Sequence, residues 1–224
     1  MMFRSKSFNI NQPVALNSLP HYNSVPNMKF ISVNVRSSII IKEVDKNEAL
    51  NTTNMLINET MNKEWRYENS VGFLNDDDEE KKWNDRYNSA NYIFKQISIS
   101  AKSDIDKKNR PKDSIFFAAY FKGVPIGVLQ FSPQNKDYPE LPIVDYLATH
   151  CGIRDCGVLL IECAVNKSQQ LGMKGKLILS SVKAAKQLYI SMGFTQLDDE
   201  VYLQLNPNES SKWYFINNCY KFIG

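Results

Sequence analysis

The chain has 224 residues, of which 43% are hydrophobic and 23% are charged, and its formal net charge is +3. These values are typical of a soluble globular protein with one main domain and a sizeable core, and so small a charge gives no reason to expect a nucleic-acid or membrane partner. No apolar run approaches the ~20 residues of a membrane-crossing helix, and the first residues lack the apolar segment of a secretory signal. We therefore expect a cytoplasmic protein.

The first 28 residues are rich in Asn, Ser and Pro and contain no acidic residue. They contain too few apolar residues to bury much surface, so we expect a flexible tail over residues 1–28 and one folded domain over residues 29–224. A start rich in Ser and Asn also suits the leaderless export signal of a bacterial effector, which is the alternative location.

The segments after the tail predict a strand and two helices. Residues 29–44 are rich in β-branched and apolar residues and predict the strand. Asp45 is a capping residue, and the apolar positions after it predict a helix to about residue 63. The charged run at 75–82 predicts a solvated loop and the start of a second helix, which carries Trp83.

A β-hairpin follows a hydrophilic connection. Residues 114–121 and 124–131 are two apolar runs separated by Lys122 and Gly123, a pair that suits a tight turn.

Residues 143–165 combine three local patterns. An apolar run at 143–148 predicts a buried strand, residues 150–157 form a turn with two glycines, and apolar residues then recur at helical spacing. Free N–H groups at a helix start point toward a bound anion. The stretch therefore suggests a site for a phosphate-bearing ligand, with an ordinary strand-to-helix connection as the alternative.

The rest of the chain predicts a strand at 176–179 and a helix that Ser180 or Ser181 caps and Gly193 ends. Alternating apolar residues at 201–205 predict another strand. Residues 213–223 predict a last strand whose aromatic side chains pack on the core.

Two of these features together resemble a known superfamily. The strand, glycine turn and helix of 143–165 are followed about 35 residues later by Y-x-x-x-G-F at residues 189–194. This order resembles the GCN5-related N-acetyltransferases, or GNAT superfamily, over about residues 110–205. The resemblance implies an α/β fold with a mixed, mostly antiparallel central sheet flanked by helices.

The resemblance implies that the turn binds acetyl-CoA as a co-substrate and that no metal is needed. The turn offers convergent N–H groups to the pyrophosphate, and an extended amide-rich arm can pair with the strand end like an added strand. The family's loop begins either at Arg154 or at Gly152 in this chain, and the second alignment keeps residues 160–162 in register with the family's helix. The expected coenzyme-binding residues are Leu147, Ala148, Thr149, Ile153, Arg154, Asp155, Cys156, Gly157 and Val158.

Two residues depart from the family pattern. Asp155 places a negative charge beside the expected pyrophosphate unless it turns outward to cap the helix. Val182 stands where many relatives have an Asn that bonds the coenzyme arm. Both leave open a domain that binds acyl-CoA without catalysis.

By resemblance, Tyr189 is the general acid that protonates the departing thiolate, and its alternative role is a core tyrosine. The amine must lose a proton before it attacks, and Asp145 is the first candidate for the base because it lies on the strand with the orientation of Leu147 and Thr149. Glu140 and His150 are further candidates.

The four cysteines fit neither a zinc pattern nor a disulfide scaffold, and we expect reduced thiols that take no covalent part in catalysis. They are Cys151, Cys156, Cys163 and Cys219.

The expected function is transfer of the acetyl group of acetyl-CoA to a primary amine of a small molecule. The alternatives are an amine of a protein or of aminoacyl-tRNA, or a non-catalytic acyl-CoA-binding module. No membrane partner is expected, and no nucleic-acid partner other than tRNA.

Overall fold

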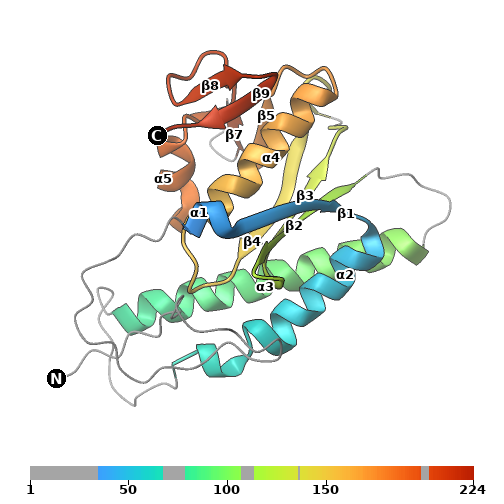
Figure 1. Ribbon diagram of the computed structural model, residues 1–224, viewed down its shortest axis with the longest axis vertical. Coiled ribbons are helices and arrows are strands. Elements are labelled where there is room, and N and C mark those ends of the chain that lie inside the picture. Colours follow the sequence, from blue (N-terminus) through green and yellow to red (C-terminus); the bar gives the residue numbers. More distant parts are fainter. Residues whose placement is uncertain (1–34, 68–78, 107–113, 136, 198–201) are drawn as a thin grey trace.

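A computed structural model describes residues 35–67, 79–106, 114–135, 137–197 and 202–224 (Figure 1). The expected tail, residues 1–28, lies outside the described residues, as do residues 29–34 of the expected first strand. The expectation of a strand is wrong for residues 35–38, which form a short helix, and is confirmed for residues 39–44. In chain order the elements are α1 (Val35–Ser38), β1 (Ile39–Val44), α2 (Lys46–Met55), η1 (Leu56–Thr60), η2 (Lys63–Trp65), α3 (Glu79–Asp106), β2 (Ile115–Phe121), β3 (Val124–Ser132), β4 (Ile143–Thr149), α4 (Cys156–Gln170), β5 (Leu177–Ser180), α5 (Lys183–Ser191), β6 (Thr195–Gln196), β7 (Tyr202–Leu205), β8 (Trp213–Ile216) and β9 (Cys219–Phe222).

The main sheet has seven strands in the order β1-β2-β3-β4-β5-β7-β6. All neighbouring strands are antiparallel except β4 and β5, which are parallel. The predicted fold class, a mixed and mostly antiparallel sheet flanked by helices, is confirmed. Among the described residues no helix is both long enough and apolar enough to cross a membrane.

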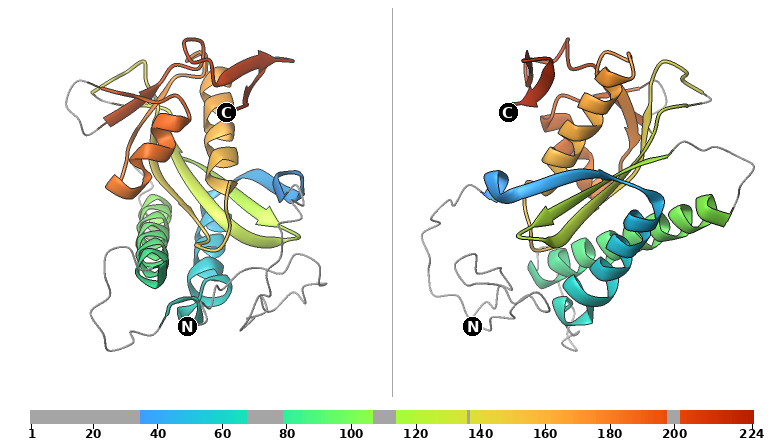
Figure 2. Two further views of the ribbon diagram at one scale, coloured as in Figure 1. Left: turned by 90° about the vertical axis from the view of Figure 1, so that its left-hand side faces the viewer. Right: turned by 45° about the vertical axis from the view of Figure 1, so that its right-hand side comes forward.

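Helices cover both faces of this sheet. In Figures 1 and 2, α4 lies on one face, and α2 and α3 lie together on the other. Both faces need cover because the side chains of each strand point alternately to one face and the other, as strand β2 illustrates. Phe117 and Phe121 pack in the core on the α4 side, whereas Phe116 and Ala118 pack in the core on the α3 side.

Local sequence signals explain several element boundaries. Asp45 caps α2, as predicted, by accepting a hydrogen bond of 2.8 Å from the Glu48 N–H. Lys122 and Gly123 have φ values of 49° and 82°, which suit the tight two-residue turn of the predicted β2–β3 hairpin. The predicted start of α5 is wrong, because its N-cap is Val182, which offers no side-chain hydrogen bond.

The C-terminal segment is a hairpin rather than the single strand expected. Strands β8 and β9 form a separate two-stranded sheet that turns at Asn217 and Asn218, both with positive φ. Asn adopts this conformation more easily than most residues, so it suits a tight hairpin turn. The expected packing on the core is confirmed for Trp213, Tyr220 and Phe222, which are buried in the core on the α4 side.

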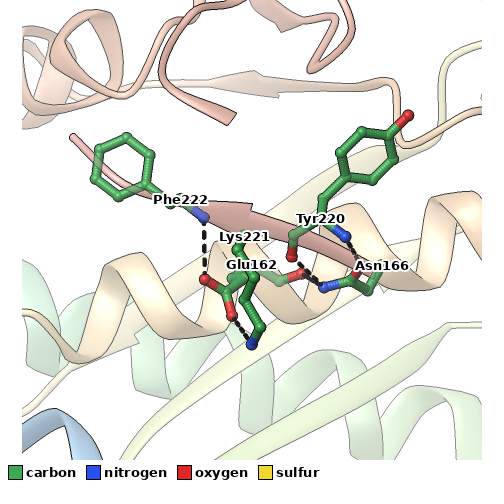
Figure 3. A network of polar contacts seen from close by, with 5 residues as sticks. All are labelled: Glu162, Asn166, Tyr220, Lys221 and Phe222. Atoms are coloured by element: carbon green, nitrogen blue, oxygen red, sulfur yellow. Dashed lines mark hydrogen bonds and ion pairs between the residues drawn. The ribbon is translucent and has the colours of Figure 1, made fainter. Parts of the chain in front are cut away.

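Two side chains of α4 hold the hairpin in place (Figure 3). The Asn166 amide donates to the Tyr220 carbonyl at 3.0 Å and accepts from the Tyr220 N–H at 2.7 Å. One turn earlier, the buried Glu162 carboxylate accepts from the Phe222 N–H at 3.2 Å and lies 2.6 Å from Lys221 Nζ. These contacts take the place of a neighbouring strand along one edge of β9.

The ion pair between Glu162 and Lys221 should contribute to stability because the carboxylate is buried. We expect Lys221→Met, which keeps most of the aliphatic stem, to lower the free energy of unfolding by about 1–2 kcal/mol. The value stays below that of a fully buried pair because the Lys221 side chain is 58% exposed. Urea unfolding measures the change.

Lys102→Met is the matched control, because Lys102 is an exposed residue of α3. Equal stability of the two variants would contradict a structural role for the ion pair.

Candidate active site

The parallel strands β4 and β5 pair over only two residues. Ile143 lies opposite Ile178 and Val144 opposite Leu179, and β4 then continues to Thr149 without β5 beside it. A β-bulge lies at the point of separation, because Phe131 pairs with Val144 but Gln130 pairs with Tyr146. Bulges bend and twist the strand that carries them. The second half of β4 therefore diverges from β5.

The diverging half of β4 leaves backbone groups without a strand partner. His150 donates its N–H to the Ile126 carbonyl of β3 at 2.7 Å. Since N–H directions alternate along a strand, Ala148 also faces β3, while Leu147 and Thr149 direct their N–H and C=O groups to the β5 side. No described strand forms hydrogen bonds with these N–H and C=O groups, so an extended ligand can form them.

The start of α4 lies beside this open edge. A Cβ placed on Gly157 would lie 3.7 Å from Leu147 Cδ2 and 4.0 Å from Thr149 Cγ2. The first helical hydrogen bond runs from the Leu159 N–H to the Asp155 carbonyl at 3.4 Å. The N–H groups of residues 156–158 have no partner within the described part of the chain. Three donors at a helix start thus face the region next to the open edge.

The residues around the start of α4 differ in their burial. Ile153 packs partly in the core on the α4 side, Arg154 and Asp155 are exposed, and Cys156 and Val158 are buried. Asp155 adopts a left-handed conformation with φ of 65° and makes no capping hydrogen bond. The Asp155 carboxylate therefore does not cap the helix, and because it is exposed, water screens its negative charge.

Tyr189 lies on α5 with its ring in the core on the α4 side, where it meets Phe194 edge-on at 5.5 Å. No described residue forms a hydrogen bond with its hydroxyl. Burial raises the pKa of Tyr189 to about 12, so the phenol keeps its proton at neutral pH. The position suits a core residue, and the unpaired hydroxyl also suits a proton donor.

Asp145 is the residue at the bulge, and Ser132 Oγ donates a hydrogen bond to its Oδ2. From the sequence, the Asp145 side chain is expected to point to the same side as Leu147, which assumes that side chains alternate regularly along β4. The bulge at Asp145 breaks this alternation. Val144 and Leu147 pack in the same core although three positions separate them. Ser132 follows Phe131, which packs on the α4 side, so the Asp145 carboxylate reaches toward the α3 side.

The other two candidate bases are less suitable. Glu140 is exposed in the connection before β4. His150 is fully buried, and both its ring nitrogens are engaged: Nε2 lies 2.9 Å from the Thr60 carbonyl, and Nδ1 lies 3.1 Å from the Gly152 nitrogen. Burial lowers the pKa of His150 to about 4, and the bond to Thr60 opposes this shift only in part.

Two cysteines near the site are protonated thiols. Burial raises the pKa of Cys156 to about 12 and that of Cys163 to about 11. A thiol is a nucleophile only as its thiolate, so at neutral pH neither Cys156 nor Cys163 is a good nucleophile.

Sequence reasoning missed two partners of the site. Ser132 ends β3 and gave no signal, because its role depends on the bulge in the neighbouring strand. Trp65 lies against His150 and Gly152 from a distant segment, with ring centroids of Trp65 and His150 4.4 Å apart. Only the tertiary structure brings these residues together.

Neither a family model nor a curated protein sequence matches the chain. Many solved structures that it is similar to are GNAT acetyltransferases, at TM-scores below 0.5. One is the PaiA N-acetyltransferase of Thermoplasma acidophilum in complex with coenzyme A, at 14% identity over 75% of this chain and 97% of that chain, with a TM-score of 0.44. Another is a GCN5-related N-acetyltransferase from Rhodopseudomonas palustris, at 15% identity over 75% and 91%, with a TM-score of 0.43. A mutant AtaT toxin bound to the C-terminus of the antitoxin AtaR has 12% identity over 75% and 90%, with a TM-score of 0.44. Likenesses this distant assign neither a substrate nor a catalytic residue.

The lowered pKa of His150 predicts a pH dependence of stability. The unfolded chain binds a proton at this residue near pH 6.5, whereas the folded chain resists protonation down to about pH 4. The unfolded state therefore binds more protons in this window, and stability falls as the pH falls. We expect a loss of about 2 kcal/mol between about pH 6.5 and pH 5, measured by urea unfolding.

His150→Asn cannot titrate and should flatten this slope. An identical slope in the wild type and the variant would show that other groups cause the loss.

Proposed function

We propose that this chain is a GNAT-type N-acetyltransferase that transfers the acetyl group of acetyl-CoA to a primary amine of a small molecule. The observation that supports this proposal is the open edge of β4 at Leu147 and Thr149, next to the free donors at the start of α4. In open sheets, ligands bind outside the carboxyl ends of parallel strands, and β4 and β5 are the parallel pair.

Acetyl-CoA fits this arrangement in two parts. Its pyrophosphate accepts hydrogen bonds from the N–H groups of residues 156–158, where the absence of a side chain on Gly157 leaves the backbone accessible beside Leu147 and Thr149. Its amide-rich arm lies along β4 and pairs with Leu147 and Thr149, with Ala148 packed behind them on the α3 side. The turn at 153–155 leads the chain into the helix, and the exposed Arg154 brings a positive charge next to Asp155 in the chain.

The reaction begins when the neutral amine attacks the thioester carbonyl carbon. A tetrahedral intermediate with a positively charged nitrogen forms and then collapses, which breaks the carbon–sulfur bond and releases the thiolate of CoA. The extra proton on the nitrogen leaves through water and ends on the thiolate, which gives the amide and the free thiol. Asp145, oriented by Ser132, accepts the proton that the ammonium group must lose, directly or through a water. An ordinary amine has a pKa near that of lysine, about 10.4, so this step is needed at neutral pH.

Tyr189 donates its phenolic hydrogen to the departing sulfur. With a pKa of about 12, the phenol is always protonated but is a weaker acid than a thiol, whose pKa is about 8.5. Complete proton transfer from Tyr189 alone is therefore uphill, and a hydrogen bond to the developing thiolate is its main contribution. This predicts a modest rate effect.

Two other acceptors and one other function remain as alternatives. The amine of a protein or of aminoacyl-tRNA would use the same coenzyme site. A non-catalytic acyl-CoA-binding module is favoured by the uncapped charge of Asp155 and by Val182, which is 55% exposed at the start of α5 and has no polar group. Thiol release with a panel of small amines, lysine peptides and aminoacyl-tRNA separates these functions.

The coenzyme assignment predicts that Gly157→Glu abolishes acetyl-CoA binding. The new side chain would start in contact with Leu147 and Thr149 and would place a carboxylate against the pyrophosphate at the helix start. Calorimetric titration with acetyl-CoA measures the loss, and far-UV circular dichroism should stay unchanged.

Gln170→Glu is the matched control, because it adds the same carboxylate at the exposed far end of α4. If Gly157→Glu still binds acetyl-CoA, the assignment of this loop as the coenzyme site is wrong.

The acid assignment predicts that Tyr189→Phe lowers kcat by about 10- to 100-fold, with little change in acetyl-CoA affinity. The change keeps the ring and its contact with Phe194 and removes only the unpaired hydroxyl. Steady-state thiol release measures the effect.

Tyr214→Phe removes a hydroxyl from the exposed hairpin and should leave kcat unchanged. If Tyr189→Phe turns over as fast as this control, Tyr189 is a core residue alone.

A further inference from the structure

His150 joins two segments that lie 90 positions apart in the chain. It follows the last residue of β4, and its ring reaches η1, where Nε2 lies 2.9 Å from the Thr60 carbonyl. On its other side, the Gly152 N–H donates to Nδ1 at 3.1 Å. The ring is fully buried.

These two contacts require one form of the ring. Because Nδ1 accepts a hydrogen bond from Gly152, it carries no proton, and the proton of the neutral ring is on Nε2. Nε2 then donates to the Thr60 carbonyl. A single neutral tautomer satisfies both backbone groups at once.

The segment reached by His150 is itself firmly held. Trp65 meets the His150 ring edge-on, with an interplanar angle of 87°, and its carbonyl accepts from Trp83 Nε1 of α3 at 2.6 Å. Asn84 of α3 bonds both the N–H and the C=O of Tyr67. The contact of His150 therefore reaches a segment anchored on α3.

On the other side, His150 shapes the start of the turn that leads into α4. The Gly152 N–H binds its ring, and the Ile153 N–H donates to its carbonyl at 3.0 Å. A Cβ at Gly152 would lie 3.1 Å from Trp65 Cζ3, so the turn rests closely on the Trp65 ring. The left-handed Asp155 and the free donors of residues 156–158 follow directly.

We propose that His150 is a positioning residue for the coenzyme loop. Its Nδ1 fixes the turn that presents the donors of residues 156–158, and its Nε2 ties that turn to the segment anchored on α3. The proposal rests on the proposed binding of acetyl-CoA at this loop. It assigns the two nitrogens separate effects, the first on affinity for the coenzyme and the second on stability.

Two conservative variants separate these effects. In His150→Asn the amide oxygen takes the place of Nδ1 and accepts from the Gly152 N–H as in an Asx turn, but the contact with Thr60 is lost. In His150→Gln the amide nitrogen takes the place of Nε2 and donates to the Thr60 carbonyl, but the acceptor for Gly152 is lost. Each variant keeps one contact.

The experiment is calorimetric titration of the full chain with acetyl-CoA and with free CoA, well below the melting temperature of each variant. We expect His150→Gln to raise the Kd of both ligands about tenfold and His150→Asn to change it little, although the Asn variant melts lower. Gly152→Ala, which presses the turn against Trp65 but keeps both ring contacts, should also weaken binding. Equal Kd values for His150→Gln, Gly152→Ala and the wild type would overturn the proposal.

Amide hydrogen exchange of the free protein provides the independent readout. The amides of Gly152 and Ile153 should exchange faster in His150→Gln than in His150→Asn, because only the Asn variant keeps the acceptor for Gly152. A wild type that binds neither ligand would overturn the proposed function, and the exchange rates would still decide whether His150 holds the loop. Equal exchange in the two variants would overturn that role.

Discussion

Backbone groups inside a protein need hydrogen-bond partners, and the second half of β4 cannot obtain them from β5. The bulge at Asp145 turns β4 away after Val144, so Leu147 and Thr149 face a gap in the sheet. An unpaired and desolvated N–H or C=O group costs about 1–3 kcal/mol. Water or a ligand can provide the missing partners, and an extended row of amides matches the spacing of these groups. The proposed site follows from this one interruption of an otherwise regular sheet.

Contacts with the rest of the molecule hold α4 beside that gap. The apolar side of α4 packs on the sheet, and Glu162 and Asn166 on the helix hold the C-terminal hairpin. At its start, the preceding turn rests on His150 and Trp65, which are held from the α3 side. Core packing and loop contacts position the helix, and Asp155 adds no cap. The donors at the helix start thus remain free because no described side chain uses them.

The sequence was sufficient for much of the fold and for the region of the site. Apolar runs predicted the strands of the main sheet other than β6, and a capping Asp45 and a Lys122-Gly123 turn predicted local geometry that the structure confirms. The bulge at Asp145 could not be predicted, because no Gly or Pro marks it and it depends on the pairing with β3. His150 was a candidate base in the sequence, yet it is fully buried, with a tryptophan from a distant segment against its ring. The C-terminal hairpin does carry a readable signal, since the consecutive Asn217 and Asn218 favour a tight turn.

The contact between α4 and β9 also concerns how the chain is made. The Glu162 carboxylate is completed by Lys221 and Phe222, which follow it by 59 and 60 positions. Domains tend to fold from the N-terminal side during synthesis, but this buried carboxylate lacks its cation until β9 has left the ribosome. The contacts of Glu162 and Asn166 with β9 therefore form only after every strand of the main sheet has been made. A product that stops just before β9 would contain that whole sheet and still leave the Glu162 carboxylate without its cation.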